Sequence, residues 1–211
     1  MEYLSNINSL TSYLPELMIV LTILCVFIAE SISSYRSSTY MISIAGLLFT
    51  GILLLFSHSS ISLLFEGMII NDSLSIFFKW LILISTLSIV LISKEDNSVV
   101  SEVKGEYYAM LLIIMLGMFA MVSAKNLLMV YLAIEMVSIP SYIIAGISKN
   151  DRESNEASLK YVIYGSFASG IMLYGLSYLY GMAGSLDINI VAAKLGSYDA
   201  SITVYMIIIF V

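Results

Sequence analysis

The chain has 211 residues, of which 60% are hydrophobic and only 11% are charged. Soluble domains carry about twice that share of charge, so the composition excludes a water-soluble globule and favours a protein dissolved in lipid. The net charge of −6 offers no basic surface for nucleic acid, and the single cysteine excludes an internal disulfide or a cysteine-based metal cluster.

Six apolar runs are long enough to cross about 30 Å of hydrocarbon. We expect membrane-spanning helices at 14–30, 40–57, 74–93, 107–124, 126–147 and 157–181. A seventh run begins near Ser201 and stops at Val211, inside a half-built span whose last carbonyls would lie unpaired in lipid. These runs predict an all-α, polytopic transmembrane bundle of six complete spans and a truncated seventh, interpreted as the N-terminal fragment of a longer protein.

The loops between the runs are short and polar, and their lysines and arginines predict the orientation, because such residues accumulate on the cytoplasmic side. With the N-terminus outside, five of these cations fall in inner loops: Arg36, Lys94, Lys104, Lys149 and Arg152. Only Lys125 and Lys194 fall in outer loops. We therefore expect the N-terminus outside.

Glu135 is the most informative residue, because it lies near the middle of the run at 126–147. A charged, unpaired carboxylate costs several kcal/mol in hydrocarbon, so this group must be paired, hydrated or protonated. A carboxyl balanced between these states can take up and release a proton as a neighbouring cation moves. Pro140 cannot donate to the carbonyl one turn back, which is then free to bind water. The competing interpretation is a structural glutamate, satisfied permanently by a neighbouring hydroxyl or lysine.

Lys160 is the second candidate and lies a few residues into the run at 157–181. At 1.5 Å per residue, Glu135 lies about 20 Å from the inner end of its helix and Lys160 only about 5 Å, a gap of roughly 15 Å. We therefore expect no direct ion pair, but a hydrated path with Lys160 at its inner mouth. The alternative is a snorkelling lysine paired with Glu156.

The remaining charges within the runs are interpreted as structural. Lys79 is expected to snorkel to the outer interface or to pair with Asp72. Glu16 and Glu30, near the two ends of the first run, are expected to be solvated. The small residues from Gly165 to Gly170 predict close helix packing.

Several motifs between Gly105 and Gly184 accompany these candidates. They are Glu106-Tyr107-Tyr108, Lys125-Asn126-Leu127-Leu128, Ser141-Tyr142-Ile143-Ile144-Ala145-Gly146, Ser154-Asn155-Glu156-Ala157-Ser158-Leu159-Lys160-Tyr161 and Tyr178-Leu179-Tyr180-Gly181. Together with Glu135, this stretch resembles the subunit N family of the proton-pumping NADH-quinone oxidoreductase (complex I), whose members are antiporter-like membrane subunits. Before Gly105 the resemblance is one of topology, with weak similarity from Gly67 to Phe78.

The resemblance implies an antiporter-like fold of inverted repeats. Residues 1–104 would form an N-terminal three-helix segment and residues 105–211 the first part of the proton-translocating repeat. Glu135 and Lys160 would carry proton translocation, and the central lysine that partners Glu135 would follow Val211.

The same resemblance implies a subunit of a redox-driven enzyme that holds no redox centre of its own. NADH, FMN, iron–sulfur clusters and quinone would belong to partner subunits in the inner (plasma) membrane. Two alternatives stay open: a subunit of a cation (sodium)/proton antiporter, which would share Glu135 and Lys160, and a membrane scaffold whose charges are static.

Overall fold

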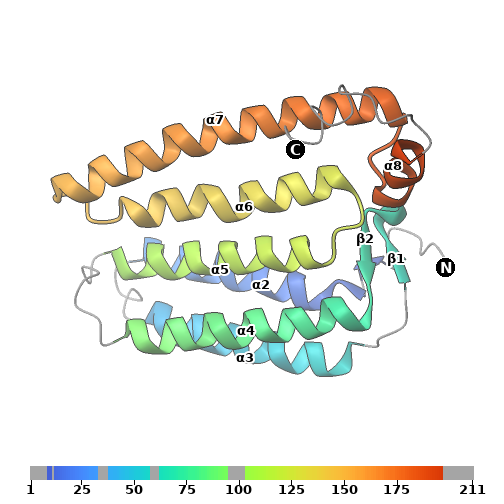
Figure 1. The fold of residues 1–211 in the computed structure, drawn as a ribbon. Helices are drawn as coiled ribbons and strands as arrows, with labels where there is room; N and C mark the ends of the chain where they lie inside the picture. Colours follow the sequence, from blue (N-terminus) through green and yellow to red (C-terminus); the bar gives the residue numbers. More distant parts are fainter. Residues whose placement is uncertain (1–8, 11, 33–37, 58–61, 95–102, 197–211) are drawn as a thin grey trace.

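The computed structural model describes residues 9–10, 12–32, 38–57, 62–94 and 103–196. Among these residues, six helices are long and apolar enough to cross a membrane. Figure 1 shows them side by side along a common direction. The predicted seventh run and Arg36 lie outside the described residues.

The six spanning helices follow the predicted order. They are α2 (Leu14–Ser31), α3 (Thr39–Phe56), α4 (Ser73–Ser93), α5 (Lys104–Val122), α6 (Leu127–Ala145) and α7 (Arg152–Ala183). Each overlaps one predicted run, so the six complete spans are confirmed. The capping-box pattern Asn150-Asp151-Arg152-Glu153 predicts that the sixth helix begins near residue 151, ahead of its apolar run at 157–181. The structure confirms this start, because the Asp151 carboxylate accepts the backbone N–H groups of Glu153 and Ser154 and caps α7 there.

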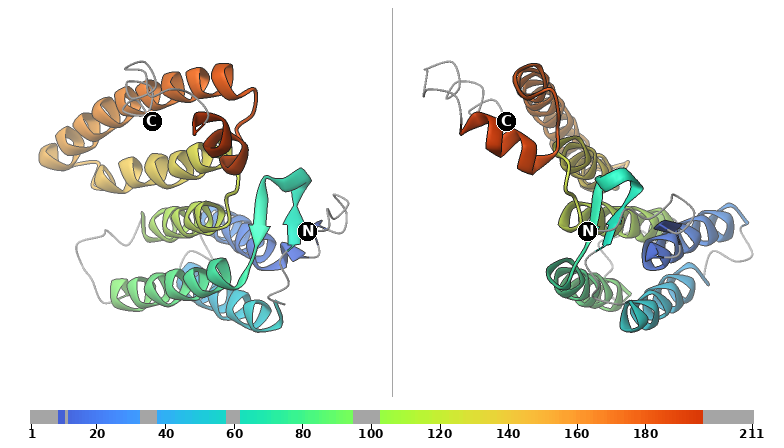
Figure 2. Two further views of the ribbon diagram at one scale, coloured as in Figure 1. Left: turned by 45° about the vertical axis from the view of Figure 1, so that its right-hand side comes forward. Right: turned by 90° about the vertical axis from the view of Figure 1, so that its right-hand side faces the viewer.

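Helix α5 is the centre of the bundle and packs against α2, α3, α4 and α6. Its inward side contributes large apolar residues that are almost fully buried, among them Leu112, Met115 and Phe119. The end-on view in Figure 2 shows α5, α6 and α7 in a row, with α2, α3 and α4 gathered around the α5 end of that row. Among the described residues, α7 is therefore packed by α6 along one side and by α8 near one end.

A short antiparallel hairpin joins α3 to α4 at one end of the bundle, where the sequence predicted only a polar loop. Strand β1 (Ser62–Leu64) pairs with β2 (Ile69–Asn71) through the 3-10 turn η2 (Phe65–Gly67). The buried side chains of Leu63, Leu64 and Ile69 stabilise the hairpin by leaving water. At Gly67 the chain reverses with a φ of 87°, a conformation that glycine adopts without steric cost.

The hairpin is hydrogen-bonded to two other connections at the same end. The Ile70 N–H donates to the Ser123 carbonyl, at 2.8 Å, in the segment between α5 and α6. The Leu127 N–H, where α6 begins, donates to the Leu186 carbonyl at 2.9 Å, just before the short helix α8 (Ile188–Leu195). Backbone hydrogen bonds thus tie together the connections α3–α4, α5–α6 and α7–α8.

A buried ion pair lies among α2, α4 and α5. The Lys79 Nζ is 2.6 Å from the Glu16 Oε1, and the two side chains are only 6% and 1% exposed. The same amine lies 6.0 Å from the centre of the Phe119 ring. The prediction of a solvated Glu16 is therefore wrong, because α2 and α4 both pack on α5 and enclose the carboxylate.

The two predictions for Lys79 are also wrong. Its side chain is buried rather than extended to the interface. Asp72 is used elsewhere, because its carboxylate accepts the Ser75 N–H at 2.8 Å and caps α4. A lysine removed from water requires a nearby carboxylate, and Glu16 supplies it.

The prediction of a solvated Glu30 is also wrong. Both of its carboxylate oxygens are buried, so this group is not solvated. The carboxylate packs against Gly105 near the start of α5, where a Cβ atom would overlap it. A glycine at this position is therefore what allows α2 and α5 to approach each other.

Candidate intramembrane acidic site

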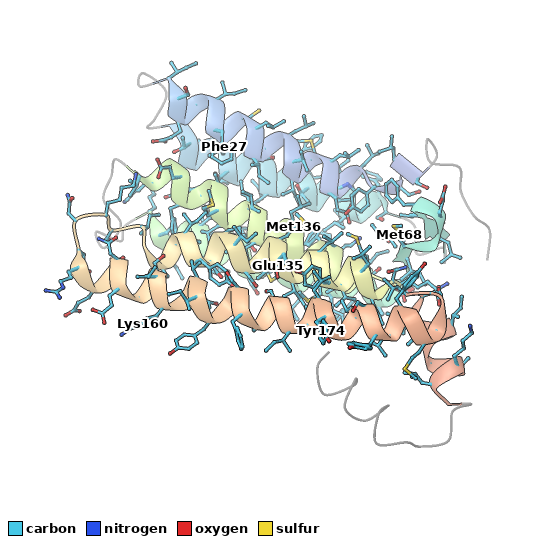
Figure 3. The ribbon with its side chains drawn as sticks, turned by 90° about the horizontal axis from the view of Figure 1, so that it is seen from above. Phe27, Met68, Glu135, Met136, Lys160 and Tyr174 are labelled. Carbon is cyan, nitrogen blue, oxygen red and sulfur yellow. The ribbon has the colours of Figure 1, made fainter. Side chains whose placement is uncertain are left out.

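Glu135 lies at the middle of α6, as Figure 3 shows. The helix begins at Leu127, because the Asn126 side chain accepts the Leu128 N–H at 2.9 Å and caps it. It continues through Pro140 to Ala145. Counted along the helix, Glu135 is about 12 Å from one end and about 15 Å from the other.

The face of α6 that carries Glu135 is turned toward α7. Tyr131, four residues earlier, packs against Leu176 and Leu179 of α7. Tyr142, seven residues later, packs edge-to-face on Tyr161 of α7, with ring centres 4.6 Å apart. Residues four and seven apart share one side of a helix, so Glu135 lies on the seam between α6 and α7.

The other side of α6 is closed by α5. A Cβ atom at Gly117 of α5 would lie 2.9 Å from the Val137 side chain and 3.0 Å from the Met136 Cβ, so these two helices are in close contact. Glu135 itself is half-buried, and its Oε1 atom is buried with no hydrogen-bond partner among the described residues. A buried acceptor in this state requires water, a proton or a cation.

Lys160 lies on α7, nearer the α6–α7 turn, and extends away from the seam (Figure 3). Its Nζ is 2.6 Å from the Glu156 Oε1 in an exposed pair, with side chains 64% and 56% exposed. Within the described part of the chain, Lys160 and Glu135 do not form an ion pair. The pairing with Glu156 is the one that the alternative interpretation names, and it leaves the role of Lys160 untested.

The predicted gap of 15 Å between the levels of Glu135 and Lys160 is too large. The Ser158 hydroxyl donates to the Tyr142 carbonyl at 2.8 Å, so these two residues lie at the same level of the bundle. Lys160 is then level with about residue 140, roughly 8 Å from Glu135 along the axis. The estimate failed because it took the run at 157–181 to begin at the membrane surface, whereas α7 extends further and aligns Lys160 more deeply against α6.

The seam also contains hydroxyl groups to which the sequence analysis assigned no role. Ser154, Ser158 and Tyr161 recur at spacings of four and three, so they share the side of α7 that faces α6. Ser141 of α6 lies opposite Tyr161, with their hydroxyl oxygens 3.4 Å apart. The spacing is visible in the sequence, but only the pairing of the helices reveals which side of α7 is covered.

These features define a class: a multi-pass helical membrane protein with an acidic group on a helix seam at mid-depth. Residues 124–211 match the family model described as NADH:quinone oxidoreductase/Mrp antiporter, TM. Respiratory complex I from Thermus thermophilus contains a chain of the same fold, with a TM-score of 0.69 at 24% identity, over 86% of this chain and 41% of that chain.

Two curated relatives are subunits of the same name. The chain is 39% identical, over 92% of its length, to NADH-quinone oxidoreductase subunit N of Anaeromyxobacter sp. (strain Fw109-5). It is 40% identical, over 84% of its length, to subunit N 2 of Chloroherpeton thalassium. The chain is a relative of the NADH-quinone oxidoreductase subunit N proteins, and it spans 38% and 36% of the lengths of these two.

Proposed function

We propose that the chain is part of a proton-translocating membrane subunit of a proton-pumping NADH-quinone oxidoreductase. The observation that carries the proposal is the Glu135 carboxyl, placed at mid-depth on the α6–α7 seam with a buried oxygen that has no hydrogen-bond partner among the described residues. Intramembrane carboxyls of this kind mark proton paths in pumps and transporters. The similarity to subunit N proteins supports the same reading.

Glu135 would act as the proton carrier of this path. It would take up and release a proton as a neighbouring cation moves. The cation would be the lysine expected beyond Val211. Lys160, close to the α6–α7 turn, would stand at the inner mouth of a hydrated path and be linked to Glu135 by water. Each proton moved against 100 mV costs about 2.3 kcal/mol, which a changing ion pair can supply.

The same proposal includes the partner subunits and the membrane in which the chain would lie. Electron transfer would take place in partner subunits that hold NADH, FMN, iron–sulfur clusters and quinone. The part of the chain that the structure describes has no group of three or more His, Cys, Asp or Glu residues able to hold a metal ion. The subunit would lie in the inner (plasma) membrane with its N-terminus outside, and residues 105–211 would begin the proton-translocating repeat after the segment 1–104.

The substitution Glu135→Gln tests the proposal, because it removes the exchangeable proton with little change in shape. In membranes carrying the complete chain in its assembled complex, we expect proton translocation to fall at least about tenfold, the effect of roughly 1.4 kcal/mol on the rate-limiting step. Lys160→Ala should slow translocation by less. Unchanged translocation in Glu135→Gln would show that this carboxyl has no part in pumping.

A cation/proton antiporter is the second candidate, because the matching family model also includes Mrp antiporters. Both candidates use Glu135, so that substitution does not separate them. Purification of the complete chain does: copurification with NADH-dependent quinone reduction supports the oxidoreductase. Sodium-driven proton exchange without any quinone-reducing partner supports the antiporter.

A further inference from the structure

Hydroxyl groups line the α6–α7 seam between the α6–α7 turn and Glu135. Nearest the turn, the Ser154 hydroxyl donates to the Ala145 carbonyl at 2.8 Å. One turn further in, the Ser158 hydroxyl donates to the Tyr142 carbonyl at 2.8 Å. These two serines give their only protons to backbone carbonyls, so they hold the helices together and are not available to pass protons inward.

The next hydroxyls inward are differently placed. Ser141 of α6 and Tyr161 of α7 have their oxygens 3.4 Å apart, across the seam. The Ser141 hydroxyl is within donating distance of both the Tyr161 oxygen and, at 2.6 Å, the Ser138 carbonyl. It has a single proton, so while it donates to Ser138 its oxygen can accept the Tyr161 proton. Edge-to-face packing on the Tyr142 ring holds the Tyr161 ring in position. The pair therefore forms a fixed crossing of the seam between two groups that can each donate and accept.

This pair lies at about the same level of the bundle as Lys160. Tyr161 directly follows Lys160 in α7, and the Ser138 carbonyl is one helical turn from Glu135. Pro140 has no N–H, so the Met136 carbonyl lacks its usual helical donor and offers an acceptor beside Glu135. Polar atoms thus continue from the level of Lys160 to within one turn of the carboxyl.

We propose that the Tyr161 and Ser141 hydroxyls relay protons across the α6–α7 seam, between the inner mouth at Lys160 and water beside Glu135. As a proton from the inner side binds the Tyr161 oxygen, the proton already on the Tyr161 hydroxyl passes to the Ser141 oxygen. Ser141 then releases its original proton to the water at Glu135. Each hydroxyl ends with one proton, and rotation of both O–H bonds resets the relay. The inference rests on the proposed role of Glu135.

Tyr161→Phe is the main test, because it deletes the hydroxyl and keeps the ring that packs on Tyr142. In membranes with the complete chain in its assembled complex, we expect proton translocation to fall about fivefold, equivalent to one lost hydrogen bond. Ser141→Ala should give a similar loss, and Ser141→Thr, which keeps a hydroxyl, should restore most of the rate. Tyr164→Phe is the matched control, because Tyr164 is 74% exposed on the same helix and should leave translocation unchanged.

The ratio of translocation rates in H₂O and D₂O separates a relay from a packing role. If Tyr161→Phe interrupts proton transfer, this ratio rises above that of the unaltered protein; if it only loosens the seam, the ratio stays the same and the relay is refuted. Wild-type translocation in Tyr161→Phe and in Ser141→Ala, together with loss in Glu135→Gln, also refutes the relay but leaves the proposed function intact. Wild-type translocation in Glu135→Gln overturns both.

Discussion

The buried ion pair between Lys79 and Glu16 gives the sharpest prediction about stability. Replacing Lys79 by methionine keeps most of the apolar stem and removes the charge. The Glu16 carboxylate then stays 1% exposed with no cation at 2.6 Å. Its Oε2 atom is also buried without a hydrogen-bond partner in the described ranges, so no other group there compensates for the loss.

The magnitude follows from the geometry. Two unit charges 2.6 Å apart in a medium of effective dielectric constant about 20 attract each other by about 6 kcal/mol. Desolvation of both ions cancels much of this attraction in the intact pair, but the single variant keeps the desolvation cost and loses the attraction. We therefore expect Lys79→Met to lower the free energy of unfolding by about 3–5 kcal/mol.

A double-mutant cycle measures the effect in the complete chain, by reversible denaturation in mixed detergent micelles at neutral pH. The variant that combines Glu16→Gln with Lys79→Met has no buried charge and should recover most of the stability lost by Lys79→Met alone. Lys149→Met is the matched control. Its pair with Glu106 is 3.9 Å long with side chains 72% and 46% exposed, so the change should be under about 1 kcal/mol.

Two results would refute this reasoning about the pair. A loss below about 1 kcal/mol for Lys79→Met would place the two side chains in effectively aqueous surroundings. Simple addition of the two single effects in the double variant would show that the charges do not interact.

Two further predictions concern the α6–α7 seam and the start of α2. Gly165→Ala should destabilise the protein by about 1–3 kcal/mol, because the added Cβ would overlap the Tyr142 phenol. At Gly170 the added Cβ meets open space, so Gly170→Ala should be neutral or slightly stabilising. Equal shifts of the thermal unfolding midpoint in the two variants would contradict this. Burial, helped by the negative charge of Glu16, raises the pKa of Tyr13 above its ordinary value. The contribution of protonated Tyr13 to stability is therefore complete below about pH 10 and falls at higher pH. Tyr13→Phe should reduce the loss of unfolding free energy at alkaline pH. Parallel losses in the variant and the unaltered protein would disprove this.

The spanning helices could be predicted because each depends on a property local in the sequence. A run of about twenty apolar residues satisfies its own backbone only as a helix in lipid, whatever its neighbours are. The start of α7 is equally local, since Asp151 caps the backbone two and three residues later. Such features require no knowledge of which helices touch.

The partners of charged side chains could not be predicted in the same way. Lys79 and Glu16 are 63 positions apart in the chain, and only the packing of α2 and α4 on α5 brings them together. The sequence offered Lys79 only the interface or the nearby Asp72, but the carboxylate of Asp72 is already used by its own helix. The hairpin was missed for a similar reason, since Leu63 and Ile69 are buried by segments distant in the chain.

At the candidate site, one residue could be predicted from the sequence and others could not. Glu135 could be found from sequence, because a carboxyl within an apolar run is conspicuous without any structure. The hydroxyls of Ser141 and Tyr161 could not be selected among the many Ser and Tyr residues until the register of α6 against α7 was known. The level of Lys160 was misjudged because that register depends on where α7 begins, not on where its apolar run begins.

The three connections joined by backbone hydrogen bonds at the hairpin end have a mechanical consequence. Backbone pairing joins three segments there: β2, residues 123–127 and residues 186–188. This pairing holds the ends of α4, α5, α6 and α7 in fixed positions relative to one another. At the other end, α6 and α7 are joined by the turn at 146–151 and by serine hydroxyls that bond single carbonyls. If these helices tilt, we expect the hairpin end to stay fixed. The largest displacement then occurs at the opposite end, which carries Lys160 and the mouth of the seam.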